Sequence, residues 1–135
     1  MGVFSGKVWD QYHPNVRLQE NGNKPDVRWV ALSNIEGFGL LAIGLPLLSI
    51  SVYQFKLGEL ENKDDVRSHS NGIKPRNVIS CNLDYKQMGV GGDNSWSAPV
   101  HTKYTLPPQE YSYSFRLRPF SSDEESLVKL SRQMF

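Results

Sequence analysis

Cysteine, histidine and net charge are the scarce features of this sequence. Its 135 residues include one cysteine, Cys81, and three histidines. A single cysteine forbids an internal disulfide and a multi-cysteine metal site. The 15 basic and 14 acidic side chains nearly cancel, and a nucleic-acid or anionic-membrane surface needs a clustered positive excess. We therefore expect no nucleic-acid partner.

Long apolar runs are missing as well. The run from Phe38 to Leu48 is interrupted by Gly44 and Pro46 and is shorter than the ~20 residues that a membrane-spanning helix needs. We therefore expect no membrane segment. The first residues lack the basic and apolar regions of a signal peptide. We interpret the start as a boundary within a longer chain, whose compartment, cytoplasmic or periplasmic, stays open.

Alternation of apolar and polar residues predicts several β-strands. Hydrophobic residues make up 39% of the chain, enough for a packed core. We expect a strand over residues 3–12, a hairpin over 26–44 with its turn at 34–37, and strands over 47–55, 77–85 and 110–118. In the last of these, the buried face would carry Tyr111, Tyr113, Phe115 and Leu117. The pattern predicts an all-β fold, an antiparallel β-sandwich.

Other segments of the chain do not alternate in this way. The charged interval 56–71 predicts a short surface helix, and the isolated His69 within it is a poor metal ligand. Ser122 and Glu125 have the spacing of a capping box, which predicts a short helix ending near Met134. We assign residues 1–120 to the β-sandwich and 121–135 to a helical tail that docks on the sheet or frays. Cys81, in a predicted strand, is expected to be a small buried hydrophobe rather than a nucleophile.

Residues 84–104, DYKQMGVGGDNSWSAPVHTKY, contain the most unusual pattern in the chain. Three glycines within four positions, Gly89, Gly91 and Gly92, permit tight reversals. Trp96 follows this loop, so we expect its ring to be exposed for contact with a ligand rather than packed in a regular strand. A flat ring with one N–H donor suits the apolar face of a sugar. The glycine spacing fits neither a P-loop nor a dinucleotide fingerprint.

Three more side chains near Trp96 have groups that could hold sugar hydroxyls. We interpret Asp93 and Asn94 first as turn-capping residues and second as ligand contacts. For His101 we favour a histidine at the start of a strand, bound by the backbone, over a role in orienting the loop or binding a hydroxyl. Glu20 is a lone carboxylate, whereas retaining glycosidases need two carboxyl groups about 5 Å apart. We therefore assign no catalytic residue and no metal ligand.

Several short stretches of the sequence resemble the closing segment of glycoside hydrolase family 2 β-galactosidases. The resemblance begins with DYKQMGVGGDNSW, APVH and YTLP in residues 84–107. It extends upstream through QENGNK at 19–24, DVRW at 26–29 and the run PLLSISVYQF that ends at Phe55, and downstream to YSYSFRLRP at 111–119. These stretches follow one another in the same order as in the sequences of that family, and together they span residues 6–119.

This resemblance implies the second half of the C-terminal β-sandwich domain of a retaining β-galactosidase that hydrolyses terminal β-D-galactosides such as lactose. The catalytic glutamates would lie on a separate (β/α)8 barrel, and Trp96 matches the tryptophan that the sandwich contributes to the rim of the substrate pocket. The implied partners are the rest of the β-galactosidase chain and the galactoside, in a parent enzyme that is a homo-oligomer. The segment alone is expected to be inactive and to hold no cofactor, and whether the parent uses Mg²⁺ or Na⁺ ions stays open.

Two other functions remain open at this point. A stand-alone carbohydrate-binding β-sandwich module would use Trp96, Asp93 and Asn94 without hydrolysis, and it would bind sugar as an isolated chain. A purely structural domain would tolerate loss of Trp96. If the sandwich is divided here, uncovered strand edges and apolar surface would lead the isolated chain to dimerise or aggregate.

Overall fold

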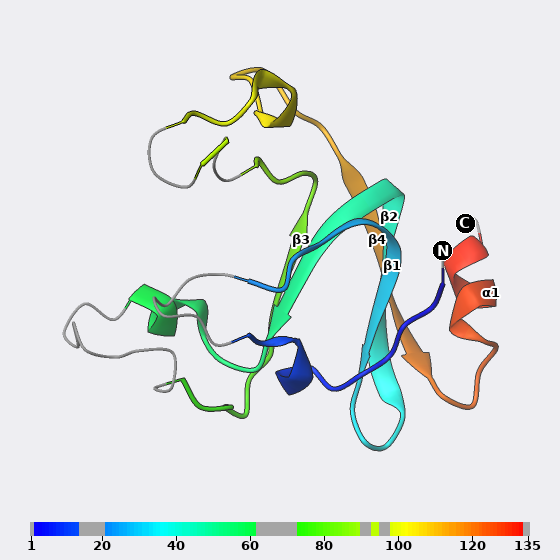
Figure 1. Cartoon of the computed structure of the whole chain (residues 1–135). Coiled ribbons are helices and arrows are strands. Elements are labelled where there is room, and N and C mark those ends of the chain that lie inside the picture. Colours follow the sequence, from blue (N-terminus) through cyan, green and yellow to red (C-terminus); the bar gives the residue numbers. More distant parts are fainter. Residues whose placement is uncertain (1, 14–20, 62–72, 90–92, 95–97, 134–135) are drawn as a thin grey trace. The chain divides into compact units, whose positions relative to one another are not determined.

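The computed structural model describes residues 2–13, 21–61, 73–89, 93–94 and 98–133. These residues form the strands β1 (Lys24–Ser33), β2 (Phe38–Tyr53), β3 (Ser80–Asp84) and β4 (Ser114–Ser121), followed by the short helix α1 (Leu127–Arg132) (Figure 1). In the sheet, β1, β2 and β3 lie in that order, and β4 pairs with β2 in antiparallel fashion. The predicted all-β antiparallel sandwich class with a short C-terminal helix is confirmed. None of the helices in the described ranges is long and apolar enough to cross a membrane.

The chain divides into two compact units, Met1–Lys24 with Ile50–Leu83 and Pro25–Ser49 with Asp84–Phe135. Strand β2 runs from the second of these units into the first. We predicted two strands here, separated at Pro46, but β2 continues through this residue. The register with β4 ends at Leu45, which lies opposite Ser114. The missing N–H of Pro46 therefore removes no hydrogen bond from that pairing.

The hairpin between β1 and β2 is the predicted one, and its turn is built by Asn34. The Asn34 side-chain oxygen accepts hydrogen bonds from the backbone N–H groups of Glu36 and Phe38, both at 3.0 Å. Gly37 has a φ of +87°, and a Cβ at this position would collide with the Ser122 side chain. A side chain at residue 37 would therefore strain both the turn and its contact with the segment after β4.

Helix α1 docks on the sheet. Leu130 is buried together with Leu41, Ile43 and Phe120, so the C-terminal tail contributes to the core rather than fraying. The helix begins later than the capping box predicted, because Ser126 rather than Ser122 is its N-cap residue and accepts a hydrogen bond from the Lys129 N–H at 3.4 Å. The partly buried residues Trp29, Ala31 and Leu127 complete this cluster.

The first unit has its own cluster, formed by Tyr53, Phe55 and Ile73. The strand predicted over residues 3–12 is wrong, since Trp9–Gln11 forms a 3₁₀ turn. A 3₁₀ turn places residues three apart on one side. Trp9 therefore stacks on Tyr12, with ring centroids 5.5 Å apart, and Tyr12 meets Phe55 edge-on at 5.4 Å. Burial in this cluster raises the pKa of the Tyr12 hydroxyl.

Strand β3 exposes the residue that we expected to be buried. Ser80 donates a 2.7 Å hydrogen bond to the Phe55 carbonyl, and the Asn82 amide donates to the Ser51 hydroxyl at 3.1 Å. Because neighbouring residues of a strand point to opposite faces, Cys81 points away from these contacts and is exposed. The predicted burial of Cys81 is therefore wrong.

The predicted orientation of the last strand is also wrong for this chain by itself. Phe115 and Leu117 are exposed, whereas Arg116 and Arg118 are partly buried. Arg118 donates to Glu124 at 3.2 Å and makes a short hydrogen bond to Gln133, just after α1. Polar groups at the C-terminal end of the chain thus hold Arg118, on the face that we expected to meet water or another sheet.

Candidate functional site

Within the 84–104 segment, Gly89 meets the last residue, Tyr104. The Gly89 N–H donates a 2.9 Å hydrogen bond to the Tyr104 carbonyl. A Cβ on Gly89 would lie 3.0 Å from the Tyr104 Cβ and 3.3 Å from a methyl group of Val100, tighter than ordinary contacts. Glycine at position 89 therefore lets the loop close on itself. The residues 90–92 that contain Gly91 and Gly92 lie outside the described residues.

Asp93 and His101 form the central side-chain contact of this segment. The His101 Nε2 atom lies 2.7 Å from Asp93 Oδ1, although both side chains are mostly exposed. His101 does not start a strand. It precedes the 3₁₀ turn Thr102–Tyr104, so our preferred interpretation of its environment is wrong: its ring binds a carboxylate rather than the backbone. The contact holds together two points of the loop that are eight residues apart.

Asn94 contacts the backbone a short distance along the chain. Its side-chain oxygen accepts a 3.4 Å hydrogen bond from the Ala98 N–H, the local bonding that makes asparagine frequent in turns. Trp96 lies within residues 95–97, outside the described part of the chain. Asp93, Asn94 and His101 are thus brought together as loop-shaping groups on both sides of Trp96 in the sequence. Their contact with a ligand stays a prediction.

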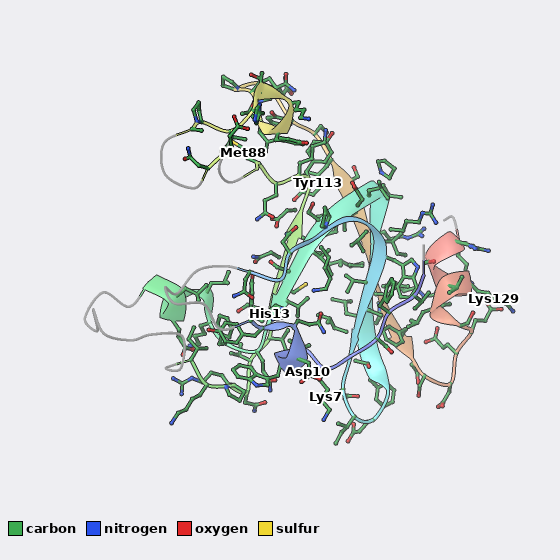
Figure 2. All side chains as sticks on the ribbon, in the orientation of Figure 1. Lys7, Asp10, His13, Met88, Tyr113 and Lys129 are labelled. Carbon is green, nitrogen blue, oxygen red and sulfur yellow. The ribbon has the colours of Figure 1, made fainter. Side chains whose placement is uncertain are left out.

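A second group of aromatic residues lies in the same unit as this loop. The Tyr85 ring stacks on Tyr113 with centroids 5.7 Å apart and lies 6.1 Å from the Tyr111 ring. Lys86 Nζ lies 4.9 Å from the Tyr85 centroid, and these residues with Leu106 line an open hollow. Figure 2 labels Tyr113 at the start of β4. Alternation in the sequence identified Tyr111 and Tyr113 as neighbours on one face, but it predicted a buried face.

The remaining candidates from the sequence are not described by the structure. Glu20 lies within residues 14–20, and His69 lies within 62–72, both outside the described ranges. Among the residues that are described, no three or more histidine, cysteine, aspartate or glutamate side chains gather as they would around a metal ion. The expectation of no catalytic residue and no metal in this segment stays a prediction.

Comparison of the sequence with known proteins identifies a family. The family model described as the β-galactosidase small chain matches residues 1–117. The chain is 38% identical over 120 residues to the β-galactosidase of Priestia megaterium, 34% identical over 125 residues to the β-galactosidase BgaC of Bifidobacterium adolescentis, and 30% identical over 125 residues to the β-galactosidase of Vibrio cholerae. These matches include 88%, 89% and 93% of this chain. The chain spans 11% of the length of each of these relatives.

Proposed function

The chain belongs to the β-galactosidase small-chain family, and from this we propose that it is the part of a retaining β-galactosidase that completes the substrate pocket. In this proposal the whole enzyme hydrolyses terminal β-D-galactosides such as lactose. The two catalytic glutamates lie in another domain of the enzyme, and this segment supplies no catalytic group. Its direct contribution is Trp96, an aromatic wall at the rim of the pocket.

The observation that carries this proposal is the coverage of the match. The family model spans residues 1–117 of this chain, yet the chain accounts for 11% of the length of its β-galactosidase relatives. Such a segment is a small part of a longer enzyme. We therefore propose that its main partner is the remainder of the β-galactosidase chain, and that the galactoside is bound jointly by both.

The loop geometry supports a presenting role for Trp96. The backbone bond between Gly89 and Tyr104 closes the base of the segment, and the contact between Asp93 and His101 ties two points within it. Both contacts join residues that lie on either side of Trp96 in the sequence, and this is what supports the role. The ring offers an apolar face to a sugar and one N–H donor to a hydroxyl.

The experiment that tests this role is Trp96→Ala in a full-length β-galactosidase that carries this sequence as its matched segment. Loss of a stacking wall should reduce kcat/KM for a chromogenic β-galactoside by about tenfold or more, which corresponds to about 1.4 kcal/mol. Phe4→Ala is the matched control, because Phe4 is an aromatic residue with 91% exposure. If both variants stay within about twofold of the wild-type enzyme, Trp96 has no role in the pocket.

A further inference from the structure

The open hollow between the tyrosines of the second compact unit has the features of a small ligand site. We call the hollow lined by Tyr85, Lys86, Leu106, Tyr111 and Tyr113 the tyrosine hollow. All five residues belong to the same compact unit. The hollow has a volume of about 200 Å³, less than the ~300–1,000 Å³ of sites for drug-sized ligands. It therefore fits a single small ring better than a larger molecule.

The tyrosine rings of the hollow are positioned by contacts within the chain itself. The Tyr111 hydroxyl donates a 2.6 Å hydrogen bond to the Pro107 carbonyl, and proline fixes its own φ angle. The Tyr85 ring stacks on the Tyr113 ring, with centroids 5.7 Å apart. The aromatic lining is thus arranged without a ligand, which lowers the entropy that binding would cost.

Two of these tyrosines are accessible from solvent. Tyr111 is 41% exposed and Tyr113 is 43% exposed, so part of each side chain can contact a bound molecule. A tyrosine combines an apolar ring face with a hydroxyl group that both donates and accepts hydrogen bonds. A hexopyranose ring is matched in the same way, because its C–H face is apolar and its hydroxyl groups project from its edge.

Lys86 supplies a positive charge to this hollow. It is an exposed residue, and its Nζ atom lies 4.9 Å from the centroid of the Tyr85 ring. The ion pairs between described residues do not include Lys86. A protein layer packed over the hollow would bury this ammonium group, which is costly unless the layer provides a partner for the charge. A sugar leaves the group in contact with water and offers hydroxyl oxygens to its N–H donors.

We propose that the tyrosine hollow is a saccharide-binding site for one hexopyranose ring. Tyr111 and Tyr113 pack on the C–H face of the sugar, and Lys86 donates hydrogen bonds to its hydroxyl groups. The proposal goes beyond the proposed function, because the hollow does not include Trp96 and does not require that residue to contact substrate.

Photoaffinity labelling of a full-length β-galactosidase that carries this sequence tests the proposal. The probe is a 1-thio-β-D-galactopyranoside with a diazirine on its aglycone, because the sulfur linkage resists hydrolysis. After irradiation the enzyme is digested with trypsin, which cleaves after lysine and arginine, and labelled peptides are quantified by mass spectrometry. The digestion separates the two regions of interest: peptides 77–86 and 104–116 contain the residues of the tyrosine hollow, and peptide 87–103 contains Trp96.

We expect the probe to label peptide 104–116, and an excess of methyl 1-thio-β-D-galactopyranoside to reduce this labelling by at least about fivefold. The same excess of cyclohexanol should have little effect, because it has an apolar ring of similar size but a single hydroxyl group. Labelling of peptide 104–116 that is absent, or that the thiogalactoside does not reduce, would overturn the proposal. Equal competition by cyclohexanol would also overturn it, because the hollow would then bind apolar rings rather than sugars.

Two variants assign the labelling to the tyrosine hollow. Tyr85→Ala and Lys86→Met change residues outside peptide 104–116, and each should reduce the labelling of that peptide by at least about threefold. Lys86→Met retains an unbranched apolar side chain, so it tests the charge without the loss of a ring. Lys129→Met, at an exposed lysine of α1, is the matched control and should leave the labelling unchanged. Labelling that is unchanged in both hollow variants would overturn the proposal.

The labelling result and the pocket result are independent. Sugar-sensitive labelling of peptide 104–116 in an enzyme whose activity is indifferent to Trp96→Ala would support the saccharide site and remove the pocket role. Loss of activity on Trp96→Ala without sugar-sensitive labelling of peptide 104–116 would do the reverse. Either outcome identifies which of the two proposals has failed.

Discussion

His101 Nε2 lies 2.7 Å from Asp93 Oδ1, and these two residues lie on either side of Trp96 in the sequence. The contact joins the two arms of a segment whose base is already closed by the bond between Gly89 and Tyr104. An exposed pair of this kind contributes little to global stability. Its effect is local, because it joins two positions that are eight residues apart in the sequence.

We predict that Asp93→Asn and His101→Gln, in a full-length β-galactosidase carrying this sequence, each lower kcat/KM for a chromogenic β-galactoside by about two- to tenfold. The free energy of unfolding should change by less than about 1 kcal/mol, because both side chains are exposed to solvent. The double variant should lose no more activity than the more severe single variant, since both substitutions remove the same bond.

The matched control for this pair is Asp123→Asn, which changes an exposed aspartate elsewhere in the same unit and should leave the kinetics unchanged. Multiplicative losses in the double variant would show that Asp93 and His101 act separately, for instance as two independent contacts to substrate. That result would replace the loop-ordering role with direct binding.

We predict that Leu130→Ala destabilises the isolated chain by about 2–4 kcal/mol, because it opens a cavity in a core cluster where this side chain is 2% exposed. Urea denaturation followed by circular dichroism measures the change. Ile35→Ala removes a similar side chain from a fully exposed position and should stay within about 0.5 kcal/mol of the wild type. Equal stability of the two variants would mean that α1 does not pack on the sheet.

We predict a pH-dependent effect of Arg76→Ala through Glu59. The Arg76 guanidinium donates two hydrogen bonds to Glu59 Oε2, at 3.3 and 3.2 Å, and lowers the pKa of that carboxyl group below its usual 4.5. A carboxyl group whose pKa is lowered by folding stabilises the fold above its unfolded pKa, and this contribution is lost as the pH falls through the folded pKa. Because the Arg76 side chain is 60% exposed, the stabilisation is less than about 1 kcal/mol.

The measurement is an NMR titration of the Glu59 side-chain carboxyl carbon in the isolated chain, together with urea denaturation at neutral and acid pH. Arg76→Ala should move the Glu59 titration to higher pH, and its small deficit in stability should disappear under acid conditions. Lys74→Ala, at an exposed lysine close to Arg76 in the sequence, should do neither. A Glu59 titration that is unchanged by Arg76→Ala would contradict the pairing.

The strands after residue 23 were predicted in approximate position from the sequence, whereas the burial of their faces was less predictable. The alternation of Phe115 and Leu117 with arginines predicted a strand over residues 110–118, which overlaps β4 at 114–118, but β4 starts later and continues through Pro119. The same alternation assigned the apolar set to the covered face. In the chain itself, Leu130 of α1 covers the other face, and Arg118 is held by Glu124 and Gln133. Alternation reports which residues share a face. It does not report which element, or which other polypeptide, covers that face.

Two further errors have local causes that a pattern of hydrophobicity cannot express. Cys81 is exposed because its neighbours Ser80 and Asn82 find hydrogen-bond partners in Phe55 and Ser51. Trp9 and Tyr12 form a 3₁₀ turn because both rings join the aromatic cluster around Phe55. In the candidate site, Asp93, Asn94 and His101 were identified from the sequence as candidate residues near Trp96. The contact between Asp93 and His101 was not, because it depends on the path of the loop.

The most direct test of the pocket-completing role is β-galactosidase activity in a two-part mixture. Activity on a chromogenic β-galactoside is measured for this chain alone, for a β-galactosidase lacking its matched segment, and for the two combined. We predict activity only in the mixture, and its loss when the chain carries Trp96→Ala. No activity in the mixture, together with saturable binding of galactose or lactose by the chain alone, would contradict this role and identify a free-standing carbohydrate-binding module.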